Sequence, residues 1–256
     1  MKMSGRTAIV TGGAGGIGAA LAARLVAAGA RVVIADLDHA HAEAAAESSG
    51  ALLGVGADVS SAAELADLIA RTEKGIGPVD LFFANAGVGV GDGLAEDDAE
   101  WALALDVNVL AHVRAARLLV PRWLERGEGY FVSTASAAGL LTQIGSAPYS
   151  VTKHAAVAFA EWLSVTYGDR GVRVSCLCPM GVNTAMLGDG HMGAQAVRAA
   201  GAVLEPEQVA AHVLAAVEEE RFLILPHPEV LEFFRRKASD YDRWLAGMRR
   251  LQAKVS

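Results

Sequence analysis

The chain has few cysteines, no excess of positive charge and no apolar run typical of a membrane span. A net charge of −7 over 256 residues argues against general nucleic-acid binding, which needs Lys and Arg to neutralise phosphates. The uncharged stretch 130–152 is rich in Ser, Thr and Gly, so we expect no transmembrane segment. The two cysteines, Cys176 and Cys178, supply too few ligands for a metal site, and we expect both to be reduced core residues.

The first six residues contain no secretory apolar segment. Together with reduced cysteines this predicts a cytoplasmic protein. Hydrophobic residues make up 53% of the chain and the mean hydropathy is +0.33, which predicts a sizeable core and is compatible with buried subunit contacts. Charged residues at 20% argue against disorder.

Short apolar runs alternate with helix-like segments along the chain. The runs predict seven strands, at residues 7–11, 31–36, 51–57, 78–84, 130–134, 172–178 and 221–225. Helices are expected between them, with long ones over residues 97–122 and 149–169 and a further one over 205–217. This alternation predicts an α/β protein with a doubly wound, mostly parallel sheet and helices on both faces. No linker or repeat interrupts it, so residues 1–256 are expected to form a single domain, with 227–256 as a C-terminal helical extension.

A glycine-rich loop, Thr-Gly-Gly-Ala-Gly-Gly-Ile-Gly, follows the first strand at residues 11–18. Glycines allow positive φ angles and let a phosphate approach the backbone. The N-terminus of the following helix offers free N–H groups to a pyrophosphate. An ordinary flexible turn is the alternative, but the position between a strand and a helix favours a dinucleotide site. The residues expected to form it are Gly12, Gly15, Gly16, Ile17 and Gly18.

Asp36 ends the second strand, 20 positions after Gly16. An acid at this place can accept hydrogen bonds from the adenosine ribose hydroxyls, and it repels a 2′-phosphate. No Lys or Arg lies in the glycine loop or directly after Asp36, so the sequence favours NAD over NADP. The alternative role for Asp36 is to cap the helix that starts near His39, but Asp38 is better placed for that.

Tyr149 and Lys153 stand four positions apart at the start of a predicted helix, directly after Pro148. Residues at i and i+4 share a helix face, so a phenol lies beside an ammonium group. A nearby cation favours the phenolate and lowers the tyrosine pKa. A shift of roughly three units, which would make Tyr149 a useful base near neutral pH, needs about 4 kcal/mol. The alternative is a surface Tyr and Lys without a joint role.

These motifs occur in an order that resembles the classical short-chain dehydrogenase/reductase superfamily over about residues 7–217. Ser136 precedes Tyr149 by thirteen positions and Lys153 follows by four, which is the spacing of that family. The resemblance implies a Rossmann-type fold and NAD-dependent interconversion of a secondary alcohol and a ketone. Besides the glycine loop and Asp36, the cofactor-binding residues implied are Asp58, Val59, Asn85, Ala86, Gly87, Tyr149, Lys153, Pro179, Val182 and Thr184.

The resemblance also implies a catalytic set of Asn108, Ser136, Tyr149 and Lys153. Tyr149 would be the general base in oxidation and the general acid in reduction. Lys153 would hold the nicotinamide ribose, and Ser136 would hydrogen-bond the substrate oxygen. Asn108 would hold a water that links Lys153 to solvent, or it would serve mainly as a buried helix asparagine satisfied by the backbone.

Two segments depart from the family pattern. Met180 follows Pro179 where the family usually has Gly, so a methionine side chain there narrows the site or touches the substrate. After the last predicted strand, Pro-His-Pro at 226–228 breaks the chain and one helix is expected over 229–254. The apolar stripe of that helix predicts packing on its own domain or on a sister subunit, and a basic helix at a membrane surface is the alternative.

Three segments, 88–94, 140–146 and 185–200, are expected to form the substrate rim. They are mostly apolar and contain Met186, Leu187 and Met192. The polar contributors expected are Gln143, Asn183, His191, Asp92 and Asp189. The rim therefore predicts an apolar, lipid- or steroid-like small molecule rather than a sugar or an acid.

We expect a homodimer or homotetramer built on the helices at 97–122 and 150–169. Two alternatives to an NAD-dependent dehydrogenase stay open. A non-catalytic NAD(H)-binding sensor or scaffold would keep the fold, although the intact Ser136, Tyr149 and Lys153 count against it. An NADP-linked carbonyl reductase would need basic residues in the glycine loop or after Asp36, and none is there.

Overall fold

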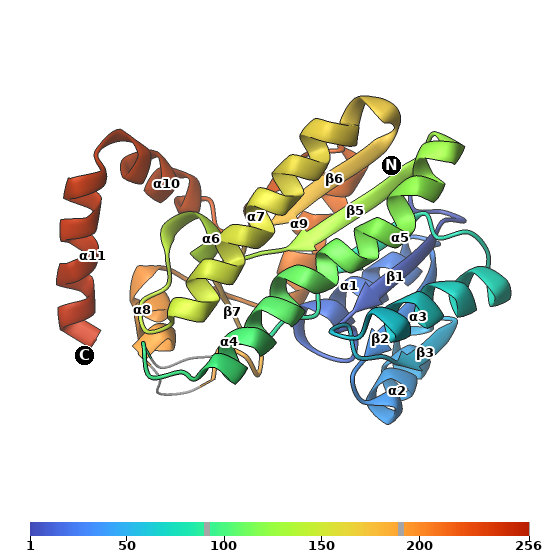
Figure 1. The fold of residues 1–256 in the computed structure, drawn as a ribbon, viewed down its shortest axis with the longest axis horizontal. Coiled ribbons are helices and arrows are strands. Elements are labelled where there is room, and N and C mark those ends of the chain that lie inside the picture. The colour runs from blue at the N-terminus through green and yellow to red at the C-terminus, as the bar shows by residue number, and fades with distance from the viewer. Residues whose placement is uncertain (90–92, 189–191, 256) are drawn as a thin grey trace.

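The computed structural model describes residues 1–89, 93–188 and 192–255, and it contains a seven-stranded parallel sheet (Figure 1). In spatial order the strands are β3 (Leu53–Gly56), β2 (Arg31–Asp36), β1 (Thr7–Thr11), β4 (Leu81–Ala84), β5 (Gly129–Thr134), β6 (Val172–Leu177) and β9 (Leu223–Ile224). Every pairing between these strands is parallel, which confirms the predicted doubly wound sheet. The strand order reverses beside β1, and ligands of such sheets bind at the carboxyl ends near this point.

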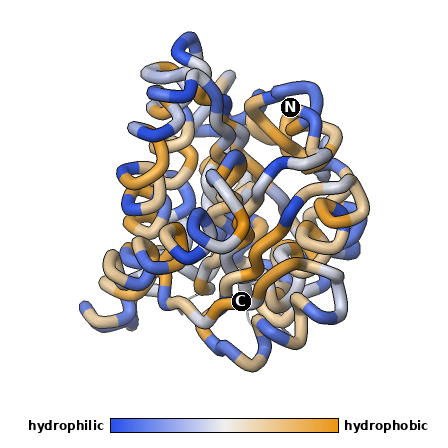
Figure 2. Tube along the Cα trace, turned by 90° about the vertical axis from the view of Figure 1, so that its right-hand side faces the viewer, coloured by the Kyte–Doolittle hydropathy of each residue, from blue (hydrophilic) through white to orange (hydrophobic). Residues whose placement is uncertain are grey.

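Helices cover both faces of the sheet (Figure 1). The helices α1 (Gly16–Ala27), α2 (His39–Ser49) and α9 (Pro206–Glu218) pack on one face, and α3 (Ala62–Gly75), α5 (Ala111–Arg126) and α7 (Ala147–Tyr167) pack on the other. Successive strand residues alternate between the two layers, so Ile9 joins one core while Ala8 and Val10 join the other. Figure 2 shows the hydrophobic stretches in the interior, with hydrophilic segments mostly outside.

Polar side chains fix where several helices begin. Asp38 accepts a hydrogen bond from the backbone N–H of His41, as predicted, and so caps α2. Ser61 accepts one from the N–H of Glu64 at the start of α3. The Glu64 carboxylate in turn accepts from the N–H of Asp58, so both the cap and the loop after β3 are fixed by local sequence.

The long helix predicted over 97–122 is not continuous. It consists of α4 (Asp98–Leu105), a π-helical turn (Asp106–Leu110) and α5. Asn108 lies inside the π-helical turn. Such turns insert one extra residue per turn and occur frequently at functional sites, because they redirect a side chain without ending the helix.

The single C-terminal helix predicted over 229–254 is wrong. The chain forms α10 (Glu229–Ser239) and α11 (Tyr241–Val255), separated by Asp240 in an extended conformation with φ −154° and ψ 92°. The Asp240 carboxylate accepts a hydrogen bond from the N–H of Arg243. Asp240 is therefore the N-cap of a second helix, α11. The apolar periodicity of the sequence continues across this break and did not reveal it.

The C-terminal helices pack beside the one-turn helix at Ala138–Leu141 and the helix at Met192–Ala200. Phe233 and Trp244 pack against the main core, with 6.4 Å between their ring centres. Val230 is buried, whereas Tyr241 and Leu245 of the predicted apolar stripe are exposed. The expected packing on the same domain is thus found for part of the stripe only. Within the described residues no helix is long and apolar enough to cross a membrane.

The segment between β6 and β9 contains elements that the sequence did not predict. A short second sheet pairs β7 (Gly181–Val182) with β8 (Val203–Leu204), and α8 (Met192–Ala200) lies between them in the chain. A one-turn helix, α6 (Ala138–Leu141), follows β5. These elements surround the carboxyl ends of β4, β5 and β6 and so shape the functional site.

Candidate active site

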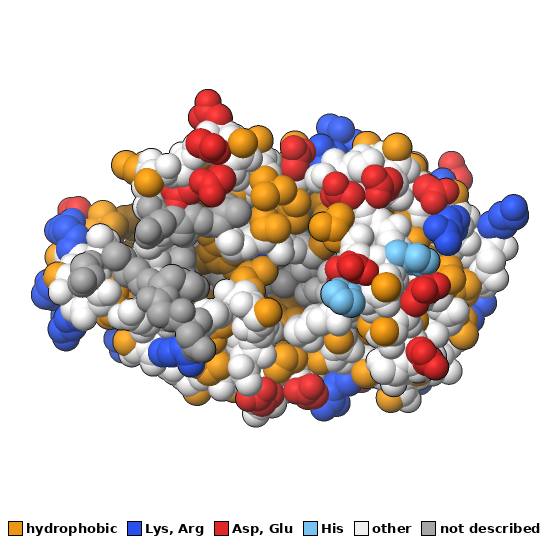
Figure 3. Space-filling view, turned by 90° about the horizontal axis from the view of Figure 1, so that it is seen from below, with side chains coloured by type: hydrophobic (Ala, Val, Ile, Leu, Met, Phe, Trp, Pro, Cys, Tyr) orange, Lys and Arg blue, Asp and Glu red, His pale blue; other side chains and the backbone are white. Residues whose placement is uncertain are grey.

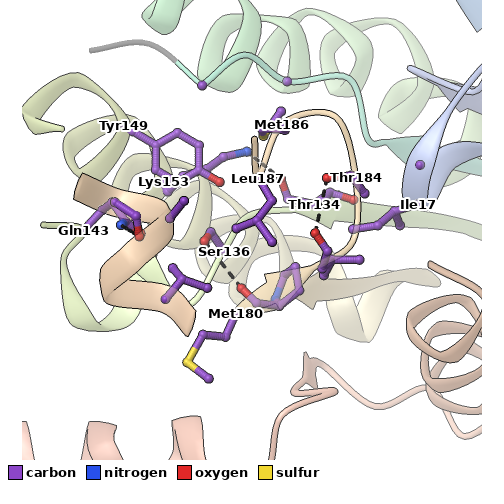
Figure 4. Close-up of a pocket in the computed structure, with 18 of the residues that line it drawn as sticks. Ile17, Thr134, Ser136, Gln143, Tyr149, Lys153, Met180, Thr184, Met186 and Leu187 are labelled. Carbon is purple, nitrogen blue, oxygen red and sulfur yellow. Dashed lines mark hydrogen bonds between the residues drawn. The ribbon is translucent and has the colours of Figure 1, made fainter. Parts of the chain in front are cut away.

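A cavity of about 430 Å³ lies at the carboxyl ends of the central strands. Most of the predicted site residues line it: Gly12, Gly15, Gly16, Ile17, Asn85, Ala86, Gly87, Ser136, Tyr149, Lys153, Pro179, Val182 and Thr184. Figure 4 shows Tyr149, Lys153 and Ser136 on one side of it, with Ile17 and Thr184 at the far end. The structure therefore brings the glycine loop and the Ser-Tyr-Lys set into one space.

Five predicted residues do not line this cavity: Gly18, Asp36, Asp58, Val59 and Asn108. Asp58 accepts a hydrogen bond from the N–H of Ser60 at the end of β3, and Val59 is buried behind it. Gly18 lies under the glycine loop, where a Cβ would come within 2.0 Å of the Gly12 carbonyl oxygen. Gly18 therefore packs against the glycine loop, whereas Asp58 and Val59 belong to the loop that follows β3.

The glycine loop forms a cradle that side chains would fill. Gly12 and Gly16 have positive φ angles of 60° and 51°. A Cβ on Gly12 would lie 2.8 Å from Ala86 Cα, and one on Gly16 would lie 2.9 Å from Thr184 Cγ2. At Gly15 a Cβ would meet no described atom within 4 Å. Backbone N–H groups at the start of α1 are thus open to close approach, which fits the pyrophosphate of a dinucleotide.

Asp36 lies beside this cradle at the end of β2. One carboxylate oxygen accepts a hydrogen bond from the N–H of Ala14 at 2.9 Å, and the other accepts from the N–H of Leu37 at 2.8 Å. No ion pair within the described ranges involves Asp36, so no Lys or Arg among these residues neutralises its carboxylate. A carboxylate at this place can accept hydrogen bonds from ribose hydroxyls.

Asn85 ties the strand ends together. Its amide nitrogen donates to the carbonyl oxygens of Thr11 and Gly12 at 3.1 and 3.2 Å, and its amide oxygen accepts from the Thr134 hydroxyl at 3.3 Å. The glycine loop, β4 and β5 are therefore held in one fixed arrangement under the cavity.

Ser146 caps the helix that carries the central pair. Its hydroxyl accepts a hydrogen bond from the N–H of Tyr149, and Pro148 occupies the first turn of α7. Lys153 is 3% exposed, and its Nζ donates to the carbonyl oxygen of Thr134 at 3.1 Å. Nζ also lies 5.5 Å from the centre of the Tyr149 ring. The predicted i, i+4 juxtaposition is therefore present and faces the cavity.

Burial dominates the acid–base properties of this pair. It raises the pKa of Tyr149 above its ordinary value of 10.0, and the neighbouring Ser136 side chain partly opposes the rise. Burial also lowers the pKa of Lys153 to about 8. Burial thus favours the protonated phenol, and positive charge brought into the site would oppose this effect. The sequence predicted a lowered tyrosine pKa from Lys153 together with a charged nicotinamide ring, and Lys153 by itself does not produce it.

Ser136 is placed just beyond β5, 8% exposed. Its hydroxyl oxygen accepts from the N–H of Ala138 at 3.1 Å and donates to the Pro179 carbonyl oxygen at 3.4 Å. The second contact is long, so the Ser136 proton can be redirected to an oxygen that enters the cavity beside Tyr149.

Asn108 is fully buried, and its side chain is already bonded on both ends. Its amide oxygen accepts from the N–H of Val88 at 2.9 Å. Its amide nitrogen donates to the Val88 carbonyl oxygen at 2.9 Å and to the Thr152 hydroxyl at 3.2 Å. The alternative predicted for Asn108, a buried asparagine satisfied mainly by the backbone, describes the side chain as found. It positions the loop after β4 against α7.

Two buried histidines at the site escaped the sequence analysis. His112, one helical turn after Asn108, bonds through Nδ1 to the Ser133 hydroxyl at 3.0 Å, and its Nε2 has no partner among the described residues. Burial, with a smaller effect of the Lys153 charge, lowers the pKa of His112 to about 3, so the ring is neutral. The i, i+4 spacing from Asn108 was the only signal in the sequence.

His227 is the second one. Its Nδ1 accepts a hydrogen bond from the N–H of Met180 at 3.1 Å, and its Nε2 donates to the Gly181 carbonyl oxygen at 3.0 Å. Burial lowers the pKa of His227, and this pair of bonds requires the neutral ring. The Pro-His-Pro break therefore clamps the loop that carries Met180, a role that no local pattern indicates.

The predicted substrate rim is present in part. Gln143, Met186 and Leu187 line the cavity (Figure 4), whereas Asn183 instead donates to both carboxylate oxygens of Glu205. Asp92, Asp189 and His191 lie outside the described residues, as does the side chain of Met192. Among the residues that are described, no Asp, Glu or Arg lines this cavity. Figure 3 shows hydrophobic side chains around a depression near the middle of this face.

Comparisons with known proteins agree with the geometry. The sequence profile of a family described as short chain dehydrogenase matches residues 6–192. The chain is 37% identical over 239 residues to a 1-deoxy-11-beta-hydroxypentalenate dehydrogenase of Streptomyces exfoliatus, covering 90% of this chain and 86% of that one. It is 34% identical over 191 residues to a 3beta-hydroxysteroid dehydrogenase 2 of Eggerthella lenta, covering 71% and 73%.

Solved structures show the same arrangement. A short chain dehydrogenase/reductase from Burkholderia phymatum, crystallised in complex with NAD, superposes with a TM-score of 0.86 at 30% identity, covering 94% of this chain and 96% of that one. A 3-ketoacyl-(acyl-carrier-protein) reductase from Brucella melitensis complexed with NADH superposes with a TM-score of 0.80 at 26% identity, covering 88% and 98%.

Proposed function

The chain belongs to the short-chain dehydrogenase/reductase family, and from that premise we propose that it is an NAD-dependent oxidoreductase that interconverts an apolar secondary alcohol and its ketone. The observation that carries the proposal is the shared cavity, in which Ser136, Tyr149 and Lys153 face the glycine loop. Proteins of this family act on alcohols and ketones. The proposal adds the cofactor, the substrate class and the roles of individual residues.

The proton chemistry is assigned to Tyr149. As the phenolate, Tyr149 takes the hydroxyl proton of the alcohol in oxidation, and as the phenol it returns that proton in reduction. Ser136 donates its own proton to the substrate oxygen, where negative charge develops. When bound, NAD accepts the hydride, and its oxidised ring adds the positive charge that favours the Tyr149 phenolate.

Lys153 and Asn108 support Tyr149 rather than react. The Lys153 ammonium, fixed by the Thr134 carbonyl, stands where it can bind the ribose of the cofactor and bias the phenol toward ionisation. Asn108 holds the loop at Val88 against α7 and so keeps the cavity wall in place. Both are buried, which excludes competing water from their hydrogen bonds.

The choice of NAD over NADP rests on Asp36. Its carboxylate is held at the cradle by the N–H groups of Ala14 and Leu37 and has no basic partner within the described part of the chain. A 2′-phosphate placed there would meet a like charge. The titration of NADH and NADPH against the protein tests this: NADH is expected to bind at least about 10-fold more tightly, a difference of about 1.4 kcal/mol. Equal affinities would remove the role given to Asp36.

The apolar substrate rests on the lining of the cavity. Met180, Met186, Leu187 and Val197 line it with apolar side chains. The relatives named above are dehydrogenases of a hydroxypentalenate and of a hydroxysteroid, according to their names. An NAD-coupled screen of secondary alcohols graded by size and polarity is the direct test, and large apolar alcohols are expected to give the highest kcat/KM. If no alcohol or ketone in a broad panel were turned over, a non-catalytic NAD(H)-binding sensor would replace the enzyme.

Assembly and location are part of the same proposal. Apolar side chains are exposed on α4 and α7, including Trp162 at 54% and Val165 at 87%. Such a patch is typical of a subunit interface and supports a homodimer or homotetramer. The free thiols of Cys176 and Cys178, both buried, support a cytoplasmic location. We treat residues 227–256 as an extension of one domain, since α10 packs on α6 and α11 packs on α8.

A further inference from the structure

A second cavity, of about 650 Å³, lies between the C-terminal helices and the substrate end of the domain. Figure 1 shows α10 and α11 at one end of the molecule, with α8 between α11 and the sheet. Its lining comes from α6 and the loop that follows it, from α8, α10 and α11, and from Met180. Its volume is in the range of small-molecule sites.

The walls of this cavity differ in charge from those of the first. Leu141, Phe233, Trp244 and Met248 give it an apolar interior like that of the first cavity. Three arginines, Arg236, Arg243 and Arg250, also line it, against the single acid Asp240. The whole chain carries a net charge of −7, so the cluster stands out against its surroundings. Figure 3 shows Lys and Arg side chains gathered at the end of the molecule where the C-terminal helices lie.

Two of the three guanidinium groups are available to a ligand. Arg236 is bonded to the Glu232 carboxylate at 2.9 Å, one turn away on α10. The Asp240 carboxylate is used by the backbone N–H of Arg243. The guanidinium groups of Arg243 and Arg250 make no hydrogen bond or ion pair within the described residues. A guanidinium is a planar fork of donors that matches a carboxylate.

The two cavities share part of their walls. Gln143, Ile144, Met180 and Val197 line both of them. These four side chains stand between the two cavities, so a molecule whose carbinol lies at Tyr149 would have to displace some of them to extend into the second. Met180 is the most adaptable of these, because its side chain is unbranched and flexible.

We propose that the second cavity binds the distal part of the substrate, an apolar chain or ring system that carries a carboxylate remote from the reacting alcohol. The inference rests on the proposed function, which concerns the alcohol group of the substrate. It adds a carboxylate at the other end of the same molecule. It also changes the expectation from the sequence, which favoured an apolar compound over an acid: the first cavity contains no Arg, and the recognition of the anion is assigned to Arg243 and Arg250 on α11.

A binding experiment tests the site without relying on turnover. Saturated fatty acids of graded length and their methyl esters are titrated by calorimetry and by fluorescence of Trp244, which lines the second cavity. The acids are expected to bind about 10-fold or more tightly than the esters, as a charge-assisted hydrogen bond provides. The double variant Arg243→Gln/Arg250→Gln should lose this preference. The control variant Arg249→Gln, whose side chain is exposed on the same helix and does not line the cavity, should keep it.

Three results would contradict the proposed carboxylate site. They are equal affinities for acid and ester in the native chain, a preference for the acid that survives in the double variant, and a fluorescence change that persists in Trp244→Phe. The third would mean that the ligand lies elsewhere. None of these results depends on NAD or on Tyr149, so the proposed function can stand while this inference falls.

Kinetics then test whether the bound acid is the end of the substrate. The substrates are hydroxy fatty acids with a secondary alcohol at the penultimate carbon, compared with their methyl esters. The double variant should lower kcat/KM for the acids by about 10-fold through KM and leave the esters unchanged, since the charge is remote from the reacting atoms. A loss of equal size for acids and esters would assign the arginines to folding instead. If the acids bind but act as inhibitors that do not compete with a neutral alcohol, the second cavity is a separate site and the inference is wrong.

Discussion

The two sides of the active-site cavity are built by different means. On the nucleotide side, the glycine loop packs closely on its surroundings: a Cβ on Gly12 would meet the backbone of Ala86, and one on Gly16 would meet the side chain of Thr184. On the substrate side, single side chains hold the walls: His227 clamps the Met180 loop, and Lys237 donates to the Leu140 carbonyl oxygen at 2.7 Å. A wall made of side chains can be changed one residue at a time, whereas the cradle cannot, so substrate choice is the part of this molecule that can vary.

The largest effect on cofactor affinity is expected at Gly18. A Cβ there would lie 2.0 Å from the Gly12 carbonyl oxygen and 2.7 Å from the Asn85 amide nitrogen, so Gly18→Ala must displace the cradle. A displacement that costs about 3 kcal/mol corresponds to a loss of NADH affinity of more than about 100-fold. Titration of NADH measures it. Gly75→Ala in α3 is the matched control, because no described atom lies within 4 Å of its Cβ and the affinity should not change. If the two alanine variants bound NADH equally well, the rigid cradle would be refuted.

Asp36 gives the next largest effect. Removing its carboxylate in Asp36→Ser abolishes charge-assisted hydrogen bonds to the ribose, which are worth about 1.5–3 kcal/mol in total, so NADH should bind about 10- to 100-fold more weakly. NADPH should gain relative to NADH because the like charge is gone. The ratio of the two dissociation constants is the measurement. Asp38→Ser, which removes only the cap of α2, should leave that ratio unchanged.

Protonation of His112 is expected to lower the free energy of unfolding at low pH. The ring is neutral in the folded chain, with a pKa of about 3, and has an ordinary pKa near 6.5 when unfolded. Its contribution to stability is therefore full above about pH 6.5 and is lost as the pH falls toward 3, by about 2 kcal/mol at pH 5. Denaturant unfolding of the native chain and of His112→Leu at several pH values measures the difference. Parallel stability curves for the two proteins would show that His112 does not titrate in this way.

The smallest effect is expected on the substrate side. His227→Asn removes the acceptor of the Met180 N–H and the donor to the Gly181 carbonyl. A neutral hydrogen bond is worth about 1 kcal/mol, so KM for the alcohol should rise about 5-fold while the affinity for NADH stays the same. His212→Asn, at an exposed position on α9, is the control. A fall in NADH affinity with unchanged KM for the alcohol would contradict this prediction, because it would show that His227 supports cofactor binding instead of substrate binding.

The two sides of the cavity also differ in how well the sequence predicts them. The glycine loop, Asp36, Asn85 and the Tyr149–Lys153 pair form within a few residues of a strand end or a helix turn, so spacing along the chain is enough to locate them. The sheet follows for the same reason, since each β–α unit is local and parallel strands place their carboxyl ends at one edge.

The substrate side depends on contacts between distant residues. His227 bonds to a loop 47 positions earlier in the chain, and Lys237 bonds to a carbonyl 97 positions earlier. The periodicity of 229–254 predicted one helix, and the N-cap of Asp240 divided it into the two helices whose packing creates the second cavity. Burial also opposes a chemical expectation: the sequence placed a cation beside Tyr149, but removal of water raises the pKa of the phenol, and the side chain that opposes the rise is Ser136.

The comparison of Tyr149→Phe with the native chain tests the central claim most directly, because the substitution removes one proton and leaves the aromatic ring that packs in α7. The account predicts that NADH binds with unchanged affinity while turnover of the best alcohol in the screen falls by about 10²- to 10⁴-fold, the usual contribution of a general acid or base. Turnover that survives in Tyr149→Phe with NADH bound would contradict it.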